Sequence, residues 1–320
     1  MSMAGIAKYE RAAGLFRCPV CARRAQADAA QADAAQADAA MADGAQADIS
    51  QSDTAQPGTA LVVDGSCLRC AAGHTFDIAR KGLVNFIPGQ KPLAGYDAAF
   101  FASRREFLQW GYYAHVRQAI VERLEALRAD GLLPDAPVIL DAGCGEGYYA
   151  RGIGEALTGA GVDATMIGAD IAKDAVRLAA TGGGPQLWAV CDVANLPIAD
   201  TALDCVLNIF TPANYAEFRR VLRPGGIVIK AIPGPDHLRE LRERLGEADH
   251  SEGDVVSIFR SRLEPLARIR ATRTLDVPSD RMHTLLGMTP LTFALDDARL
   301  EGLEVPRITI DAELLVGRSV

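Results

Sequence analysis

Residues 138–149 read VILDAGCGEGYY, and this stretch decides the fold of the 320-residue chain. An apolar strand runs into Gly143-x-Gly145-x-Gly147, and a helix is expected to begin at once. Glycines at such a junction let the backbone turn sharply and approach a ligand closely. The spacing differs from the G-x-G-x-x-G of dinucleotide enzymes. Asp141 stands at the end of the strand, where its carboxylate would orient the loop or reach a cationic group of a ligand.

Strand and helix patterns alternate along the chain from residue 137 onward. The strand candidates are PVILDAG, TMIGADI, QLWAVCD, ALDCVLNIF, GGIVIKAI, RATRTLDV and RITIDAELLVG. Helices are expected between them at 148–158, 173–181, 213–222 and 236–248, and earlier, as one or two helices, at 100–128. This alternation predicts an α/β fold with a mainly parallel seven-stranded sheet and helices on both faces. The last two strands follow one another closely, which suggests an antiparallel hairpin at one sheet edge.

Two more carboxylates follow the glycine-rich turn at the ends of successive strands. Asp170 ends the second strand, where an acid can accept hydrogen bonds from both hydroxyls of a ribose. Asp192 ends the third strand, beside the place expected for an adenine ring. A glycine turn after a strand is weak evidence alone, because such turns are common. Acids at three successive strand ends, in this order, indicate a nucleoside-type cofactor.

Two C-x-x-C pairs precede this region, Cys18/Cys21 and Cys67/Cys70, and His74 follows the second pair. In a reducing compartment such pairs favour metal or redox chemistry over disulfides, and soft ligand pairs suit tetrahedral zinc. On spacing alone, either Cys67/Cys70 or Cys70/His74 completes the site. Lengthening the loop between the pairs costs only about 1.2 kcal/mol, whereas structural zinc contributes on the order of 10 kcal/mol.

The low-complexity tract at residues 26–60 repeats a degenerate QADAA pentad. A five-residue step gives a helix no apolar stripe, so we expect a solvated helix or a disordered insert without a catalytic role. The chain contains no apolar run near the ~20 residues of a membrane span. Its N-terminus lacks the apolar core of a signal peptide, so a cytoplasmic protein without membrane contact is expected.

The formal net charge of −8 argues at first against a nucleic-acid substrate. Six of the acidic residues lie within 25–60, which holds no lysine or arginine, so the rest of the chain carries an excess of only two. Basic residues gather around the cysteine pairs and after them: Arg17, Arg23, Arg24, Arg69, Arg80, Lys81, Lys91, Arg104 and Arg105. A basic N-terminal surface is therefore compatible with RNA.

The cofactor half of the chain resembles the class I S-adenosylmethionine methyltransferases. A closer resemblance joins both halves: C-P-x-C at Cys18, Cys70-x-x-x-His74-x-Phe76-Asp77, Arg104-Arg105-x-Phe107-Leu108-x-x-Gly111-x-Tyr113, DAGCGEGYY, Pro233-Gly234-Pro235-Asp236-His237-Leu238 and Met288-Thr289-Pro290. These motifs are similar to those of the RlmA-type 23S rRNA (guanine-N1)-methyltransferases. The likeness spans nearly the whole chain except the pentad tract.

The resemblance implies S-adenosylmethionine as cofactor, structural zinc, and methylation at N1 of a hairpin-loop guanine in 23S rRNA. It favours Cys18, Cys21, Cys70 and His74 as the zinc ligands, with Cys67 spare. The implied cofactor site, together with the strand-end acids, consists of Tyr113, Asp141, Gly143, Gly145, Glu146, Gly147, Tyr148, Asp170, Asp192 and His237. Guanine N1 must lose a proton, and Asp192 and His237 are the candidate catalytic bases. The resemblance leaves open whether the protein forms a homodimer.

The resulting division is a zinc-binding module at 1–90, a helical linker at 91–130 and a methyltransferase domain at 131–320. Two other functions compete with rRNA methylation. A small-molecule C- or O-methyltransferase, such as a quinone-pathway enzyme, would share the cofactor half but lacks the cysteine and histidine motifs. A non-enzymatic RNA-binding protein would not need the intact glycine and acid positions.

Overall fold

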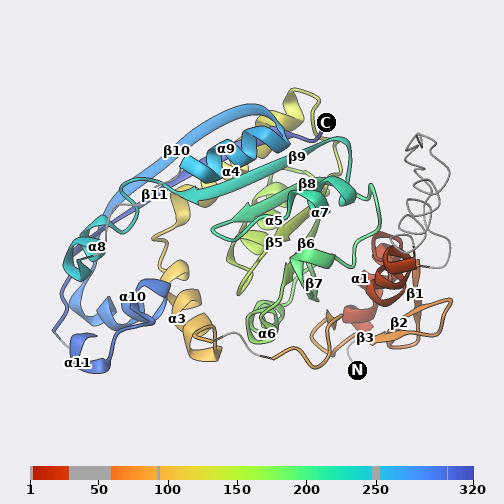
Figure 1. The fold of residues 1–320 in the computed structure, drawn as a ribbon, viewed down its shortest axis with the longest axis horizontal. Coiled ribbons are helices and arrows are strands. Elements are labelled where there is room, and N and C mark those ends of the chain that lie inside the picture. The colour runs from red at the N-terminus through yellow and green to blue at the C-terminus, as the bar shows by residue number, and fades with distance from the viewer. Residues whose placement is uncertain (1–2, 29–58, 92–93, 247–252, 301) are drawn as a thin grey trace, which may run out of the picture.

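The computed structural model describes residues 3–28, 59–91, 94–246, 253–300 and 302–320. An eight-stranded sheet forms its centre, in the order β10-β11-β9-β8-β5-β6-β7-β4 (Figure 1). The strands are β4 (Leu83–Asn85), β5 (Val138–Ala142), β6 (Thr165–Asp170), β7 (Leu187–Val190), β8 (Leu203–Ile209), β9 (Leu222–Pro233), β10 (Glu264–Asp276) and β11 (Arg307–Arg318). Neighbours from β9 to β4 run parallel, and β11 is antiparallel to both β9 and β10.

All seven predicted strands are present, and β10 and β11 form the predicted antiparallel pair at one edge. The eighth strand, β4, was not predicted. It belongs to the segment assigned to the zinc-binding module, yet it pairs with β7, with Leu83 opposite Trp188 and Asn85 opposite Val190. A three-residue strand is too short to show a pattern of its own, so only its distant partner identifies it.

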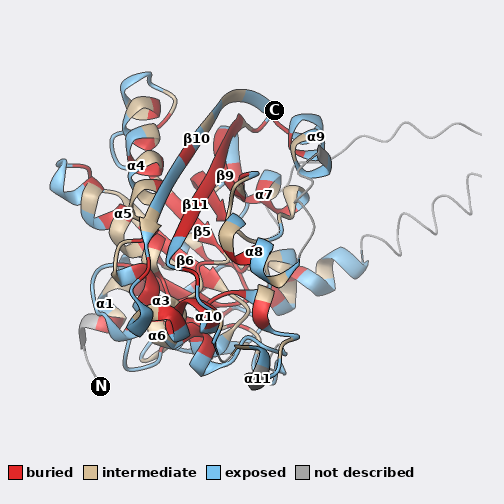
Figure 2. Ribbon diagram, turned by 90° about the vertical axis from the view of Figure 1, so that its left-hand side faces the viewer, coloured by how far each residue is buried: buried red, intermediate tan, exposed pale blue. Residues whose placement is uncertain are grey.

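Helices cover both faces of the sheet. One face carries α4 (Ala114–Ala129), α5 (Tyr148–Gly159) and α6 (Lys173–Thr181), and the other carries α1 (Met3–Ala12), α7 (Tyr215–Val221) and α9 (Gly253–Arg262). Successive residues of a strand alternate between the two cores, so Ile139 packs with the first set and Leu140 with the second. Figure 2 shows the inner strands buried between helices whose outer surfaces are exposed, whereas the edge strand β10 is largely exposed. Burial on both faces explains why the inner strands β5 to β8 are mainly apolar.

The predicted helical stretch at 100–128 forms two helices, α3 (Ala98–Gln109) and α4, separated near Gly111, whose φ is +86°. The other short elements are α8 (Arg239–Leu245), α10 (Met282–Gly287), α11 (Asp297–Leu300), η1 (Ala13–Leu15), η2 (Val193–Asn195), η3 (Ser279–Arg281) and η4 (Pro290–Thr292). The helix expected at 236–248 is shorter because Gly246 adopts the left-handed conformation that ends it. The helix α9 was not predicted.

The N-terminal module is a three-stranded antiparallel sheet, β1 (Leu61–Asp64), β2 (Cys67–Cys70) and β3 (Thr75–Asp77), with a helical segment at 19–28. It lies beside the β7/β4 edge of the central sheet (Figure 1). Of the repeat tract at 26–60, only 26–28 and 59–60 fall within the described residues, and the prediction for the remainder lies outside them. No helix in the described ranges has the length and apolarity needed to cross a membrane.

Candidate active site and metal centre

Four of the predicted metal ligands converge in the N-terminal module. Cys18 and Cys21 lie at the start of the helical segment, Cys70 ends β2, and His74 directly precedes β3. Their ligand atoms all lie within 4.8 Å of one another. Cys21 Sγ is 3.7 Å from Cys70 Sγ and 3.3 Å from His74 Nδ1. A tetrahedral zinc with ordinary Zn–S and Zn–N bonds needs ligand separations of about 3.5–3.8 Å, so the four residues fit a structural zinc.

The fifth candidate, Cys67, stands apart from this cluster. Its Sγ donates to the backbone carbonyl of Asp64, 3.2 Å away. Of the two ligand sets left open by the spacing, the structure therefore brings together the one containing Cys70 and His74. With all four positions supplied by protein, the metal has no open place for catalysis.

The glycine loop joins β5 to α5 in a conformation that other residues resist. Gly143, Gly145 and Gly147 have φ of +84°, +53° and +83°, all in the left-handed region. The N–H of Gly143 donates to the carbonyl of Ala169 at 2.8 Å, which draws the loop across the end of β6. A Cβ on Gly143 would lie 2.6 Å from the side chain of Thr211. The loop therefore needs glycine to pass this closely over the strand ends.

Asp170, at the end of β6, holds the glycine loop in place through hydrogen bonds. Its carboxylate accepts hydrogen bonds from the N–H groups of Gly145 and Ala172, both at 2.8 Å. Burial raises the pKa of Asp170, although these two amides and the charge of Arg104 act in the opposite direction. Each carboxylate oxygen keeps further acceptor capacity. The side chain can therefore still accept hydrogen bonds from two ribose hydroxyls.

Asp141 is a buried acid without a full complement of partners. Neither of its carboxylate oxygens makes a hydrogen bond of normal geometry within the described chain. Burial raises the pKa of Asp141 to about 7, although the backbone N–H of Ala150 acts in the opposite direction. An unpaired buried carboxyl is costly, and a cationic ligand group beside it removes that cost. The ammonium group of S-adenosylmethionine fits this requirement.

Arg104 of α3 lies over the glycine loop and was not predicted as a site residue. Its Nε is 3.2 Å from Glu146 Oε2, and the Arg104 side chain is 21% exposed. Its positive charge also favours ionisation of Asp170 and Tyr113. The guanidinium thus brings a positive charge to the glycine loop. Periodicity gave no sign of this role, and the only signal was the arginine pair within the family motif.

The two predicted catalytic candidates lie far apart along the carboxyl edge of the parallel strands. Asp192 follows β7, where it caps η2 by accepting the N–H of Ala194 at 2.8 Å. His237 follows β9, and β7 and β9 stand four strand positions apart, or about 19 Å at ~4.8 Å per strand. A pocket of about 280 Å³, lined in part by Asn85 and Ile171, lies beside the end of β7. Asp192 and His237 therefore cannot both reach one acceptor atom.

Three aromatic rings lie together near the carboxyl end of β9. His237 stacks on Phe210 with ring centroids 5.4 Å apart at 28°, and Tyr113 meets Phe210 edge-on at 5.9 Å. The Nδ1 atom of His237 accepts the N–H of Asp311, and its Nε2 lies 3.3 Å from Tyr113 Oη. Burial raises the pKa of Tyr113 to about 12, against the charge of Arg104. The rings offer flat faces on which a nucleobase can stack.

Phe210 adopts a strained backbone, with φ of +53°. A buried lysine holds the strained turn in place. Lys230 Nζ donates to Asn208 Oδ1 at 2.7 Å and to the carbonyl of Thr211 at 2.9 Å. It therefore binds the turn on both sides of Phe210. Burial lowers the pKa of Lys230 to about 8. A strained backbone that is held in place by surrounding hydrogen bonds is typical of functional sites.

Tyr148 and Glu146, both predicted in the cofactor site, also line a second pocket, between α3, α4 and α5. The ring of Tyr148 lies beneath the guanidinium of Arg117, 4.8 Å from its centroid. The other predicted residues, from Asp141 to Asp192, stand along the carboxyl ends of β5, β6 and β7.

The sheet order, the glycine loop and the strand-end acids define a class I S-adenosylmethionine-dependent methyltransferase. A sequence profile described as "Methyltransferase domain" matches residues 139–226, and one described as "RlmA, N-terminal", a zinc ribbon, matches residues 58–92. The chain belongs to the family of RlmA-type 23S rRNA (guanine-N1)-methyltransferases. Zinc and S-adenosylmethionine are accordingly the groups that its two sites hold.

Two relatives support this membership. The Bacillus subtilis protein YxjB, whose name describes a 23S rRNA (guanine-N1)-methyltransferase, is 36% identical over 269 residues, covering 79% of this chain and 91% of its own. The 23S rRNA (guanine(748)-N1)-methyltransferase of Streptomyces fradiae is 36% identical over 240 residues, covering 73% of this chain and 82% of its own.

Proposed function

We propose that the protein transfers a methyl group from S-adenosylmethionine to N1 of a guanine in a hairpin loop of 23S rRNA. The observation that carries this proposal is the relation, over most of the chain, to proteins named for that reaction, combined with strand-end residues that fit the cofactor. A loop guanine is unstacked or readily flipped, which lowers the cost of bringing its edge into a cleft. The cytoplasm is the compartment that such a substrate requires.

Three acids and one arginine would hold the cofactor. Asp141 would pair with its ammonium group, Asp170 with the ribose hydroxyls and Asp192 with the adenine amino group. Arg104 would pair with its carboxylate. S-adenosylmethionine supplies an electrophilic methyl group on a sulfonium, which an acceptor in line with the breaking bond takes up. The glycine loop would align the two partners and exclude water, and such alignment supplies much of the rate.

His237 would act at the acceptor end. Its position beside Phe210 and Tyr113 supports a role for the three rings in stacking a guanine. Nδ1 accepts a hydrogen bond from Asp311, so the neutral ring carries its proton on Nε2, which faces Tyr113. In this tautomer neither ring nitrogen has a free lone pair, so the Tyr113–His237 pair would orient the guanine, and the N1 proton would leave to solvent. Asp192, at the distant β7 end, serves the cofactor in this scheme.

The N-terminal module would bind the RNA through contacts to its backbone phosphates. Arg23, Arg24, Arg80 and Lys81 are exposed on it and support this role. Arg17 does not, because it is buried and pairs with Asp200 at 3.0 Å. Residues 1–90 would thus be the RNA-binding module, 91–130 the linker and 131–320 the catalytic domain.

Methyl transfer to RNA tests the proposal directly. The purified chain is incubated with labelled S-adenosylmethionine and unmodified 23S rRNA, and the product is mapped by primer extension. A methyl group at guanine N1 blocks reverse transcriptase, so a single stop in a hairpin loop is expected. The substitution His237→Ala should reduce the rate far more than cofactor affinity. Label that appears only on small molecules, or no stop in the RNA, would refute the proposal.

A further inference from the structure

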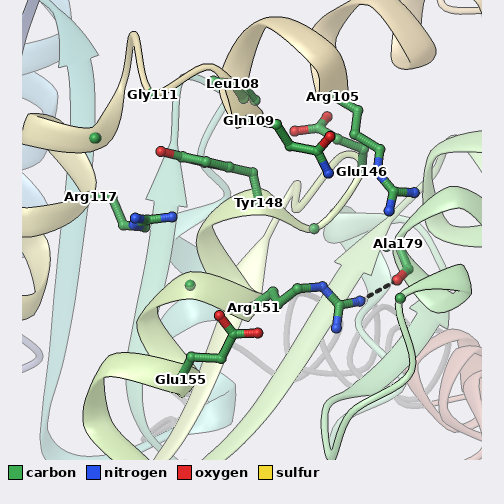
Figure 3. Close-up of a pocket in the computed structure, with 14 residues that line it drawn as sticks. Arg105, Leu108, Gln109, Gly111, Arg117, Glu146, Tyr148, Arg151, Glu155 and Ala179 are labelled. Atoms are coloured by element: carbon green, nitrogen blue, oxygen red, sulfur yellow. Dashed lines mark hydrogen bonds between the residues drawn. The ribbon is translucent and has the colours of Figure 1, made fainter. Parts of the chain in front are cut away.

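A pocket of about 300 Å³ lies on the outer side of the glycine loop, between α3, α4, α5 and α6 (Figure 3). Three arginines from three different helices line it: Arg105 of α3, Arg117 of α4 and Arg151 of α5. Tyr148 projects between them from the first turn of α5 (Figure 3). The glycine loop contributes Glu146 and Gly147 to the wall.

Backbone carbonyls hold two of these arginines in place without neutralising them. Arg105 donates to the carbonyl of Leu178 at 3.2 Å, and Arg151 donates to the carbonyls of Ala179 at 2.6 Å and Gly183 at 2.9 Å. Carbonyl dipoles orient a guanidinium but leave its charge uncompensated.

Arg117 rests on the ring face of Tyr148 instead, 4.8 Å from its centroid. None of the three arginines makes an ion pair within 4.0 Å in the part of the chain that the structure describes. The pocket therefore presents three oriented cations that lack a carboxylate partner.

The acidic residues around the pocket do not cancel the positive charge of the three arginines. Glu146 is engaged with Arg104, on the cofactor side of the loop. Glu155 stands one turn beyond Arg151, at the end of the pocket away from Arg105 (Figure 3). Burial lowers the pKa of Arg151, Glu155 raises it, and repulsion from Arg105 lowers it further. An anion between Arg105 and Arg151 would relieve that repulsion.

We propose that this pocket is a subsite for backbone phosphates of the RNA substrate, formed by Arg105, Arg117 and Arg151. Planar guanidinium groups bind phosphate oxygens through paired N–H donors, which suits both the chemistry and the fixed orientation seen here. The inference rests on the proposed function and adds a contact on the catalytic domain itself. Phosphates flanking the target nucleotide would then be held next to the loop that positions the cofactor.

The pocket shares Glu146, Gly147 and Tyr148 with the implied cofactor site. None of the three strand-end acids, Asp141, Asp170 and Asp192, lines the pocket. The cofactor carboxylate is nevertheless a second anion that the arginines could take. Measuring RNA and cofactor affinity on the same variants distinguishes the two sources of negative charge.

Arg117 is the residue to change, because its substitution leaves both carbonyl-tethered arginines in place. Binding of protein-free 23S rRNA transcript to the zinc-loaded full chain is measured by filter binding from about 50 to 200 mM salt. Losing one phosphate contact should lower the slope of log affinity against log salt by about 0.7–0.9. We expect this fall for Arg117→Gln, a larger fall for Arg117→Glu, and the wild-type slope for Arg117→Lys.

Arg128→Gln is the matched control, since Arg128 lies on the same helix but pairs with Asp135 at 2.8 Å, outside the pocket. Calorimetry with S-adenosylmethionine shows whether each variant is folded and whether the pocket serves the cofactor. An unchanged salt slope in Arg117→Glu, with RNA methylation intact in the wild type, would overturn the subsite alone. Weakened cofactor binding with an unchanged RNA slope would assign the pocket to the cofactor. A wild-type chain that neither binds nor methylates RNA would overturn the proposed function as well.

Discussion

At the scale of single residues, we expect one carboxyl group, that of Asp141, to make cofactor binding depend on pH. Burial raises its pKa to about 7, so the group is neutral in acid and ionised above neutrality. An ammonium ion binds the ionised form more tightly. We predict that affinity for S-adenosylmethionine rises as the pH increases from about 6 to about 8 and then levels off. Calorimetry at three pH values across this range measures the effect.

The same group fixes the sign of the pH dependence of stability. Its pKa is about 7 in the folded protein and about 3.9 in an unfolded chain, so the folded state binds this proton more tightly. Without cofactor, its contribution to the free energy of unfolding should decrease as the pH rises from about 4 to about 7. Asp141→Asn should remove both effects, whereas Asp174→Asn, at an exposed position of α6, should keep them. Persistence of the pH dependence in Asp141→Asn would assign it to another group.

The metal cluster predicts one zinc per chain and a sharp contrast between two neighbouring cysteines. Cys70 Sγ lies 3.4 Å from His74 Nδ1, whereas Cys67 bonds the carbonyl of Asp64. Cys70→Ser should therefore lose zinc, and Cys67→Ser should retain it. Metal analysis of the purified variants decides between the two ligand sets. Zinc loss in Cys67→Ser as well as in Cys70→Ser would indicate the four-cysteine arrangement.

At the scale of secondary-structure elements, α1 supports the glycine loop through β7. Tyr9 Oη donates to the carbonyl of Trp188 at 2.7 Å and accepts its N–H at 3.1 Å. The ring of Trp188 lies directly under the loop, where a Cβ on Gly147 would be 2.6 Å away. The position of the loop therefore depends on a helix near the start of the chain.

Removing the hydroxyl of Tyr9 tests this support. Tyr9→Phe leaves a buried N–H and a buried carbonyl without their partner, so the free energy of unfolding should fall by about 1–3 kcal/mol. Tyr96→Phe removes a hydroxyl from a side chain that is 36% exposed, and it should change stability by less than about 0.5 kcal/mol. Chemical denaturation of both variants measures the difference. Equal stability of the two would show that the hydrogen bonds to Trp188 contribute nothing net.

Elements with a local signal were predictable, and those defined by distant partners were not. The strand leading to Asp141 is apolar and ends in glycines, so its position and role followed from its own residues. The strand at 83–85 exists only because β7 lies beside it, about a hundred residues later. In the sequence, Arg104 does not differ from other charged residues of a helix. Its position follows only from the packing of α3 over the glycine loop. The turn at Phe210 could not be predicted either, because phenylalanine rarely adopts a positive φ.

At the scale of the whole molecule, the N-terminal module is part of the catalytic fold. Phe16 and Phe86 pack in the same apolar core as Leu140 and Val206 of the central sheet. Lys8 Nζ donates to the carbonyl of Gln186 at 2.7 Å, beside β7. Removing this module would expose a large apolar surface of β6 and β7.

We therefore predict that a truncated chain beginning at residue 95 fails to fold cooperatively and does not bind S-adenosylmethionine. A chain lacking only residues 31–57 is the control. It keeps Thr59, whose carbonyl accepts the N–H of Cys18 at 2.7 Å, and it should retain zinc and cofactor binding. Thermal melting and calorimetry compare the two. A cooperative melt with normal cofactor affinity in the shorter chain would show that the module is dispensable for folding.

The pairing of β4 with β7 also bears on the order in which the protein is made. The ribosome releases β4 about a hundred residues before its partner, and at roughly 5–20 residues per second this interval lasts about 5–20 s. During that time the edge of β4 has no strand to pair with, so the early module must keep itself from misassociating. Zinc would give the nascent segment a folded core before β7 is made. Chelation of zinc during cell-free synthesis should then lower the soluble yield more than chelation after release, and equal yields would contradict this role.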